Sequence, residues 1–308
     1  MIAGVDIGGT KCAVLLGDHQ GNILKKTVIK TTNFQETYTA IQGELKNIAP
    51  FDCIGISCGG PLDEEKGVIL SPPNLPDWDE VKIVDDFSSL FGVPVKIRND
   101  ANACAVAEHK FGAGVGCKNM LFLTFGTGLG AGIIVDGKLY SGTNGNAGEV
   151  GHVRMSPNGP IGFGKHGSFE GFCSGQGIRQ LGSIYAERAL KKGIIPLYTQ
   201  KENYDTPDIA NAARQGDKTA IQVFNKCGSM LGKGLAVLVD VLNPERIVIG
   251  SVYARCQDLL EKPMLKTLKK ESLSVSLSVC EVVPAKLGEK IGDAAALAVA
   301  LEAYDESH

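Results

Sequence analysis

The strongest constraint on the fold is a unit that occurs twice, in which a glycine-rich turn joins two apolar runs. The first copy joins Met1–Val5 to Cys12–Leu16, and the second joins Met120–Thr124 to Ala131–Val135. Short apolar runs bounded by glycine are typical of buried strands. A repeated strand unit predicts two similar domains, because each sheet must bury its faces against other elements. We therefore expect an α/β fold of two such domains facing each other across a cleft.

The segments that follow each copy extend the pattern. Ile23–Ile29 predicts a third strand, Phe34–Ile48 has the apolar spacing of a helix, and Cys53–Ser57 predicts another strand. The second copy adds a long apolar helix at Thr219–Leu242 and a strand at Arg246–Ile249.

The last helix, Asp293–Tyr304, is expected to fold back on the first domain. The sequence thus predicts a small N-terminal domain of residues 1–112 plus 293–308. A larger domain of residues 113–292 completes the chain.

Composition narrows the class of protein. The 308 residues carry a formal net charge of −3 and no dense basic run, which argues against a nucleic-acid partner held through its phosphates. No window approaches the roughly 18 apolar residues of a membrane span, and no secretory signal begins the chain. The nine cysteines are scattered without a CxxC pair, as expected of reduced thiols. We expect a cytoplasmic protein with neither a membrane nor a nucleic-acid partner.

The two glycine-rich turns are candidate phosphate sites. Glycines let a backbone approach an anion, and successive N–H groups in a tight turn suit phosphate oxygens. Aligning the copies places Asp6 opposite Thr124, so only the first turn carries a carboxylate, which would orient Mg²⁺ through water. Either turn alone is equally consistent with an ordinary hairpin, and neither matches a P-loop or a GxGxxG dinucleotide motif. The candidate nucleotide-binding residues in the turns are Asp6, Gly8, Gly9, Thr10, Lys11, Gly126, Thr127 and Gly128.

A candidate general base lies in the segment Val93–Phe111, which predicts a strand, a short turn and a helix from about Ala101. Asp100 in this turn can accept the proton of an attacking hydroxyl, and Asn99 can both donate to and accept from sugar hydroxyls. The alternative is that Asp100 only caps the helix, a role that Asp fills well. The two roles are compatible.

A glycine-rich stretch of low periodicity supplies further polar groups. Glu149 and His152 lie in the run Gly148–His152, and Glu170 follows. Such a stretch suits a loop that lines a polyol site. The alternative for His152 is a solvated or structural imidazole.

One competing motif is the G-x-S-x-G sequence at Gly55–Gly59, which follows a strand as a hydrolase nucleophile elbow does. An elbow must open a helix, whereas Gly60, Pro61 and a polar stretch follow here. We interpret this segment as a loop that contacts substrate through Gly60.

Eight ordered motifs across nearly the whole chain resemble the ROK family, which contains bacterial-type sugar kinases and sugar-responsive repressors. The motifs are DIGGTK at Asp6–Lys11, GGPLD at Gly59–Asp63, PNLPDW at Pro73–Trp78, NDANA at Asn99–Ala103, FGTGLGAG at Phe125–Gly132, GEVGH at Gly148–His152, LNPERIVIG at Leu242–Gly250 and GDAAALA at Gly292–Ala298. The resemblance implies two ribonuclease H-like (actin-like ATPase) domains, the use of ATP with Mg²⁺, and Asp100 as the base. It implies that Asn74, Asn99, Glu149, His152 and Glu170 surround the sugar and that Gly250 and Ser251 lie near the nucleotide. The repressor branch carries a helix-turn-helix domain before the kinase-like part, and the chain begins at the DIGGTK strand, so the kinase branch is expected.

The chain departs from the family pattern at a zinc site, which the family builds from the loop histidine and three cysteines. The corresponding positions here hold Ile161, Phe163 and Ser168, which cannot replace thiolates as zinc ligands. A relocated site of His152, His166 and Cys173 has only three evident ligands. We predict that zinc is absent and that Ile161 and Phe163 pack the loop hydrophobically instead.

The leading hypothesis is transfer of the γ-phosphoryl group of Mg-ATP to a hydroxyl of a hexose or N-acetylhexosamine, as in a glucokinase. The alternative is a non-catalytic sugar-binding or regulatory protein, favoured by the missing zinc ligands and by the single Gly250 before Ser251 where the family usually has more glycines. Family resemblance also implies a dimer or tetramer. The particular sugar and hydroxyl depend on pocket shape, which periodicity does not reveal.

Overall fold

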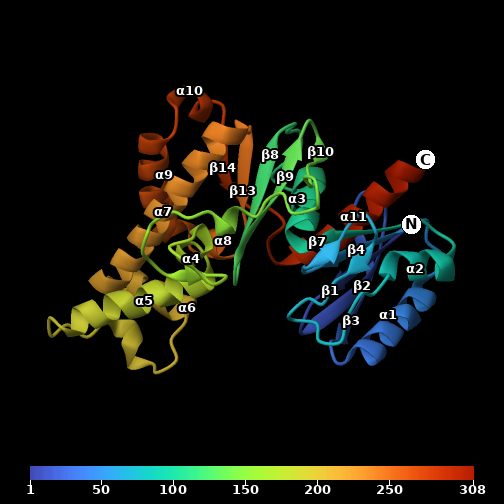
Figure 1. Ribbon diagram of the computed structural model, residues 1–308, viewed down its shortest axis with the longest axis horizontal. Coiled ribbons are helices and arrows are strands. Elements are labelled where there is room, and N and C mark those ends of the chain that lie inside the picture. Colours follow the sequence, from blue (N-terminus) through green and yellow to red (C-terminus); the bar gives the residue numbers. More distant parts are fainter. The chain divides into compact units, whose positions relative to one another are not determined.

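The computed structural model describes residues 1–308 and contains two five-stranded sheets with helices around them (Figure 1). The strands are β1 (Ile2–Ile7), β2 (Lys11–Gly17), β3 (Ile23–Lys30), β4 (Ile54–Cys58), β5 (Leu62–Asp63), β6 (Val68–Ile69), β7 (Val95–Asn99), β8 (Met120–Phe125), β9 (Leu129–Val135), β10 (Lys138–Leu139), β11 (Ile161–Gly162), β12 (Lys165–His166), β13 (Arg246–Ile249) and β14 (Glu281–Pro284). The α-helices are α1 (Phe34–Ile48), α2 (Ile83–Phe91), α3 (Asp100–Phe111), α4 (Phe169–Phe172), α5 (Gly175–Leu190), α6 (Thr206–Arg214), α7 (Lys218–Leu242), α8 (Val252–Arg255), α9 (Gln257–Glu271), α10 (Ser274–Leu277) and α11 (Ile291–Ser307). Three short 3₁₀ helices are η1 (Val150–His152), η2 (Leu197–Gln200) and η3 (Gly288–Lys290).

The two sheets have the same topology. Their strand orders are β3-β2-β1-β4-β7 and β10-β9-β8-β13-β14, so in both the first strand of the unit is central, with the second and third on one side and the fourth and fifth on the other. In the first sheet β2 pairs antiparallel with β1 and β3, whereas β4 pairs parallel with β1 and β7. The repeat read from the sequence is confirmed at the level of topology.

The chain divides into two compact units. Unit 1 comprises Met1–Gly116, Gly132–Ala147 and Lys286–His308, and unit 2 comprises Cys117–Ala131 and Gly148–Ala285. Residues 132–147, which include β10 and most of β9, are thus grouped with unit 1. The predicted domains, residues 1–112 plus 293–308 and residues 113–292, have other boundaries than these two units. That domain division remains a prediction.

Unit 1 is a sheet covered on both faces, because the side chains of each strand alternate between two cores. Ala3, Val5 and Ile7 of β1 belong to a core shared with α1 and α2, whereas Ile2 belongs to a core shared with α11. Figure 1 shows α1 and α2 on one side of these strands and α11 on the other. The prediction that the last helix packs on the first domain is confirmed.

The close approach of α11 requires glycine in β4. A Cβ added at Gly55 would lie 2.0 Å from Ala300 N and 2.3 Å from Ala296 O. Helix α1 has the predicted bounds, and its buried face carries the residues expected from the 3.6-residue period.

Unit 2 contains the long helix α7, which packs against α9. A Cβ at Gly228 would lie 2.7 Å from Leu260 O, and one at Gly232 would lie 2.2 Å from Met264 O. Glycine in a helix interior costs roughly 1 kcal/mol relative to alanine, so these residues are explained by the close backbone contact that they permit.

Candidate functional site

In unit 1, the turn between β1 and β2 contains Gly8, Gly9 and Thr10. The Gly8 N–H donates to Lys11 O at 3.2 Å within the turn, so this amide is already used. A Cβ at Gly9 would lie 2.6 Å from Asn74 O, which shows that the loop carrying Asn74 packs directly on the turn. The backbone N–H groups of Gly9 and Thr10 are therefore the candidate phosphate donors of this turn. Asn74 lies next to them.

Asp6 occupies the penultimate position of β1 and is half-buried. Burial raises the pKa of Asp6 to about 6, and the negative charges of Asp293 and Asp100 add to the rise. A Cβ at Gly292 would lie 2.8 Å from Asp6 Oδ2. Unit 1 thus brings Asp293, at the start of α11, and Asp100, at the start of α3, close enough to Asp6 for their charges to raise its pKa.

Asp100 is the first residue of α3, and strand β7 runs directly into this helix. The interpretation of Asp100 as the N-cap is wrong: Asn99 is the N-cap, and its Oδ1 accepts from Ala101 N at 3.0 Å. The Asp100 carboxylate also accepts from Ala101 N, at 2.8 Å, and part of this residue's surface stays exposed to solvent. Desolvation by the surrounding protein raises the pKa of Asp100, and the Ala101 hydrogen bond opposes that rise.

Asn99 also contacts the Gly60 segment. A Cβ at Gly60 would lie 3.2 Å from Asn99 Nδ2, so these two predicted substrate residues are neighbours. The competing hydrolase motif is not an elbow: Ser57 lies inside β4 with 2% of its surface exposed, and β5 rather than a helix follows. The segment is a strand end and loop, as expected.

In unit 2, the turn between β8 and β9 contains Gly126, Thr127 and Gly128. The Gly126 N–H donates to Gly128 O at 3.0 Å, and Gly175 N at the start of α5 donates to Gly126 O at 2.8 Å. This turn has the same length as the first and begins at the same place in its sheet.

Glu170 lies on α4 and reaches the same turn. Its Oε2 accepts from Leu129 N at 3.0 Å, and a Cβ at Gly128 would lie 2.7 Å from that oxygen. Glu170, which the family resemblance places near the sugar, thus also holds the candidate phosphate turn.

The GEVGH segment is held against β9 by two glycines. A Cβ at Gly148 would lie 1.9 Å from Ala131 O, and one at Gly151 would lie 2.0 Å from Leu129 O. Between them, Glu149 is exposed, and His152 is exposed at the end of η1. The backbone of this segment is therefore fixed while its two polar side chains stay accessible.

The segment at the expected zinc positions forms the hairpin β11–β12. The prediction that Ile161 and Phe163 pack this loop is wrong: Ile161 is 43% exposed and Phe163, at positive φ in the hairpin turn, is 88% exposed. Hydrogen bonds hold the hairpin instead. Gln180 of α5 accepts from Ile161 N and donates to Ile161 O, both at 2.8 Å.

Ser168 completes this network from the third of those positions. Fully buried, it caps α4 by accepting from Gly171 N at 3.0 Å, and its hydroxyl donates to Gly162 O at 3.4 Å. No group of three or more His, Cys, Asp or Glu side chains that could hold a metal ion occurs in residues 1–308. His152, His166 and Cys173 therefore form no such group, and Cys173 is buried with its thiol donating to Cys227 O at 3.6 Å.

Ser251 follows β13 and Gly250 with an unusual backbone. Its φ of 55° and ψ of −113° lie in a region that glycine normally occupies. A Cβ at Gly126 would lie 3.7 Å from Ser251 Oγ, so Ser251 lies beside the second turn.

Comparison with known proteins matches residues 2–303 to the ROK family. The chain belongs to the ROK family. It is 32% identical over 300 residues to a glucokinase of Thermotoga maritima, covering 94% of each chain. The structure of a ROK family glucokinase from Streptomyces griseus in complex with glucose and AMPPNP is similar, with a TM-score of 0.78, 31% identity and coverage of 98% of this chain and 99% of that one. A ROK family transcriptional regulator, a homologue of the E. coli MLC protein, has a TM-score of 0.85 at 26% identity, covering 99% of this chain and 78% of the regulator.

The fold class predicted for this ROK chain is confirmed: it is an α/β protein with two five-stranded sheets, and its structural relatives have the ribonuclease H-like (actin-like ATPase) fold. No helix is both long and apolar enough to cross a membrane.

Sequence reasoning missed two acidic residues of unit 1 in this ROK chain. Asp293 influences Asp6 and pairs with Lys26 at 2.7 Å, and Glu64 binds the backbone at Asn99. The signal for Asp293 was present in the GDAAALA motif, whereas Glu64 stands just after the GGPLD motif with no pattern of its own.

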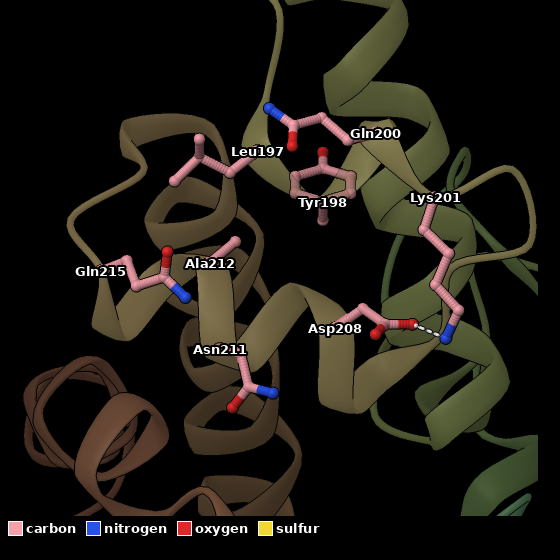
Figure 2. Close-up of a pocket in the computed structure, with 8 residues that line it drawn as sticks. All are labelled: Leu197, Tyr198, Gln200, Lys201, Asp208, Asn211, Ala212 and Gln215. Atoms are coloured by element: carbon pink, nitrogen blue, oxygen red, sulfur yellow. Dashed lines mark hydrogen bonds and ion pairs between the residues drawn. The ribbon is translucent and has the colours of Figure 1, made fainter.

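A shallow pocket of ≈ 390 Å³ elsewhere in unit 2 is separate from all these residues (Figure 2). Lys201 and Asp208 form an ion pair at 2.7 Å among its lining residues, and Tyr198 lies at its base with its hydroxyl donating to Gly182 O. None of the predicted site residues lines this pocket, so it is not the candidate active site.

Proposed function

We propose that this ROK protein is a sugar kinase that transfers the γ-phosphoryl group of Mg-ATP to a hydroxyl of a hexose or N-acetylhexosamine. The observation that carries the proposal is the arrangement in unit 1, where the exposed residue Asp100 has a raised pKa and lies close enough to affect the half-buried Asp6 beside a glycine-rich turn. The glucokinase relatives, one of them bound to glucose and AMPPNP, support the same reaction class.

Asp100 acts as general base in this proposal. Its carboxylate takes the proton of the sugar hydroxyl as the new O–P bond forms, while the bond from the γ-phosphorus to the bridging oxygen breaks and ADP leaves. Desolvation raises the pKa of Asp100 from its ordinary value, which brings the base closer to the operating pH. The helix cap uses the Oδ1 of Asn99, so Nδ2 is the group of this side chain that would donate to a sugar hydroxyl.

The phosphates are bound by the turns in this proposal. In unit 1, the backbone N–H groups of Gly9 and Thr10 in the first turn donate to phosphate oxygens, and Lys11 follows them in the chain. In unit 2, Thr127, Gly250 and Ser251 are the proposed contacts to the nucleotide. The half-buried Asp6 fits a Mg²⁺ ion held through water, since carboxylate oxygen is a preferred ligand of this cation. Bound there, Mg²⁺ would neutralise charge that develops on the phosphate oxygens.

Around the sugar we place Gly60, Asn74, Glu149, His152 and Glu170. We propose that no zinc ion is required, because Gln180 and Ser168 donate hydrogen bonds to Ile161 O and Gly162 O and so hold the segment where the family places that ion. Elemental analysis of protein purified without chelator should find well under one zinc per chain, and a stoichiometric signal would refute this part.

A coupled ADP-release assay over a panel of hexoses and N-acetylhexosamines tests the function. Turnover with at least one sugar, dependent on ATP and Mg²⁺, is the expected result. From the family resemblance we propose that the protein forms a homodimer or homotetramer, which light scattering tests, and assays should use that oligomer. We also propose a cytoplasmic location, where ATP is available.

The second candidate is a non-catalytic sugar-binding or regulatory protein. The similarity to a ROK family transcriptional regulator favours it. Isothermal titration calorimetry separates the two: heat of sugar binding with no ADP release under any nucleotide supports the regulator, and turnover excludes it.

A further inference from the structure

A buried charged network lies behind the junction of β7 and α3. Arg98 Nη1 donates to Glu64 Oε2 at 2.8 Å, and Arg98 Nε donates to Glu302 Oε2 at 3.1 Å. The side chains of Glu64, Arg98 and Glu302 are 6%, 14% and 16% exposed. Removing such charges from water costs free energy unless each is paired and hydrogen-bonded. Loss of one member would therefore leave its partner's charge buried without compensation.

Glu64 is the member that reaches the candidate catalytic segment. Its Oε1 accepts from the Asn99 backbone N–H at 2.8 Å and from Asn102 Nδ2 at 2.9 Å. Asn102 is itself only 2% exposed. One carboxylate therefore fixes the last residue of β7 and the first turn of α3, on either side of Asp100.

The chemistry of these contacts requires a carboxylate. Asn99 N, Asn102 Nδ2 and Arg98 Nη1 are all donors, and an ionised carboxylate offers two acceptor oxygens and no donor. A glutamine at position 64 has one acceptor oxygen, so its NH₂ group would face at least one of these donors. The substitution keeps the shape of the side chain while breaking the network.

We propose that Glu64 is a positioning residue that holds Asn99 and Asp100 in the geometry needed for sugar binding and proton transfer. It touches neither substrate in this account and acts through the backbone at Asn99. The inference rests on the proposed function for its kinetic consequences, although the contacts themselves are independent of it.

Glu302 provides the matched control. It belongs to the same network and is also largely buried, but its side-chain hydrogen bonds are to Arg98 and none is made to Asn99 or to α3. Glu302→Gln and Glu64→Gln are the same chemical change. A merely structural role predicts equal effects of the two substitutions at equal loss of Tm.

The test compares the two variants in ADP-release kinetics, in calorimetry with D-glucose and N-acetylglucosamine, and in hydrogen exchange of the peptide that contains residues 99–105. Glu64→Gln should lower kcat by about 10–100-fold, since a displacement of the order of 1 Å has effects of this size. It should also weaken sugar binding through Asn99 and speed amide exchange at the start of α3. Glu302→Gln should stay within about 3-fold of wild type in each measurement.

Equal effects of the two variants, or an unchanged Glu64→Gln enzyme, would overturn the inference. Absence of turnover in the wild-type protein is a different outcome, because it rejects the proposed function. Amide exchange in residues 99–105 then decides alone whether Glu64 fixes this segment, with faster exchange in Glu64→Gln than in Glu302→Gln as the supporting result.

Discussion

Glu170 accepts a hydrogen bond from the backbone N–H of Leu129 at 3.0 Å, which links the helix α4 to the glycine-rich turn of β8–β9. The contact means that a residue expected at the sugar also sets the conformation of a candidate phosphate turn. The candidate substrate and phosphate sites of unit 2 would thus share one carboxylate.

Glu170→Ala should raise KM for ATP as well as for sugar. It leaves Leu129 N–H without its partner, and loss of one such hydrogen bond, about 1.4 kcal/mol, corresponds to roughly 10-fold in binding. Glu170→Gln keeps an acceptor oxygen and should raise KM for ATP by less. Initial-rate kinetics with each substrate varied measure both constants; a rise confined to the sugar KM would show that the contact with Leu129 does not support the turn.

Ser251→Gly should stabilise the protein. The Ser251 backbone, at φ 55° and ψ −113°, stores conformational strain that glycine avoids, and such strain costs about 1–3 kcal/mol. Urea denaturation should show a gain of about 1 kcal/mol. Ser251→Ala is the control because it removes the hydroxyl but keeps the strain. An equal gain from alanine would contradict this explanation.

Asp6→Asn should change the pH dependence of stability. The pKa of Asp6 is raised from 3.8 to about 6 in the folded protein, so the folded state keeps a proton that the unfolded state releases between these values. The contribution of Asp6 to stability is therefore lost as pH rises through about 4 to 6. The variant should exceed wild type by about 1–2 kcal/mol at pH 7.5, with a smaller difference at pH 4.5.

Urea denaturation at both pH values, in the presence of chelator to remove Mg²⁺, provides this measurement. A stability difference that does not depend on pH would contradict the assigned pKa.

Gln180→Ala should loosen the β11–β12 hairpin. The reciprocal hydrogen bonds to Ile161 are lost, so we expect a lower Tm and a sugar KM raised by about 3–10-fold, the effect of one or two modest hydrogen bonds. Phe163→Ser is the control, because its side chain is 88% exposed and should leave Tm unchanged. Thermal unfolding and sugar-dependent rates test the pair. A Tm loss in Phe163→Ser larger than in Gln180→Ala would restore the hydrophobic explanation of this loop.

The sequence predicted the fold well where periodicity and turn chemistry act locally. Helix α1 and strand β13 both have the predicted bounds. The duplicated topology followed from the two strand-turn-strand units, because each has the same local signals.

Local patterns failed where the partner of a residue lies far along the chain. Phe163 was expected inside because it is apolar, but the β11–β12 turn points it outward, and Gln180 lies 19 residues beyond Ile161. Glu64 meets Asn99 across 35 residues, and no periodicity links them. Helix α3 begins at Asp100, one residue before the predicted start, so Asn99 and not Asp100 is its N-cap. Sequence propensities do not define a helix boundary to a single residue.

Asp100 is the proposed base of a sugar kinase, and the substitution Asp100→Asn tests this role. The substitution keeps the size of the side chain and removes the proton acceptor, so kcat in the ADP-release assay should fall by about 10²–10⁴-fold. Calorimetry should show that the variant still binds the sugar that wild type phosphorylates. A variant that binds sugar and turns over at the wild-type rate would contradict the account.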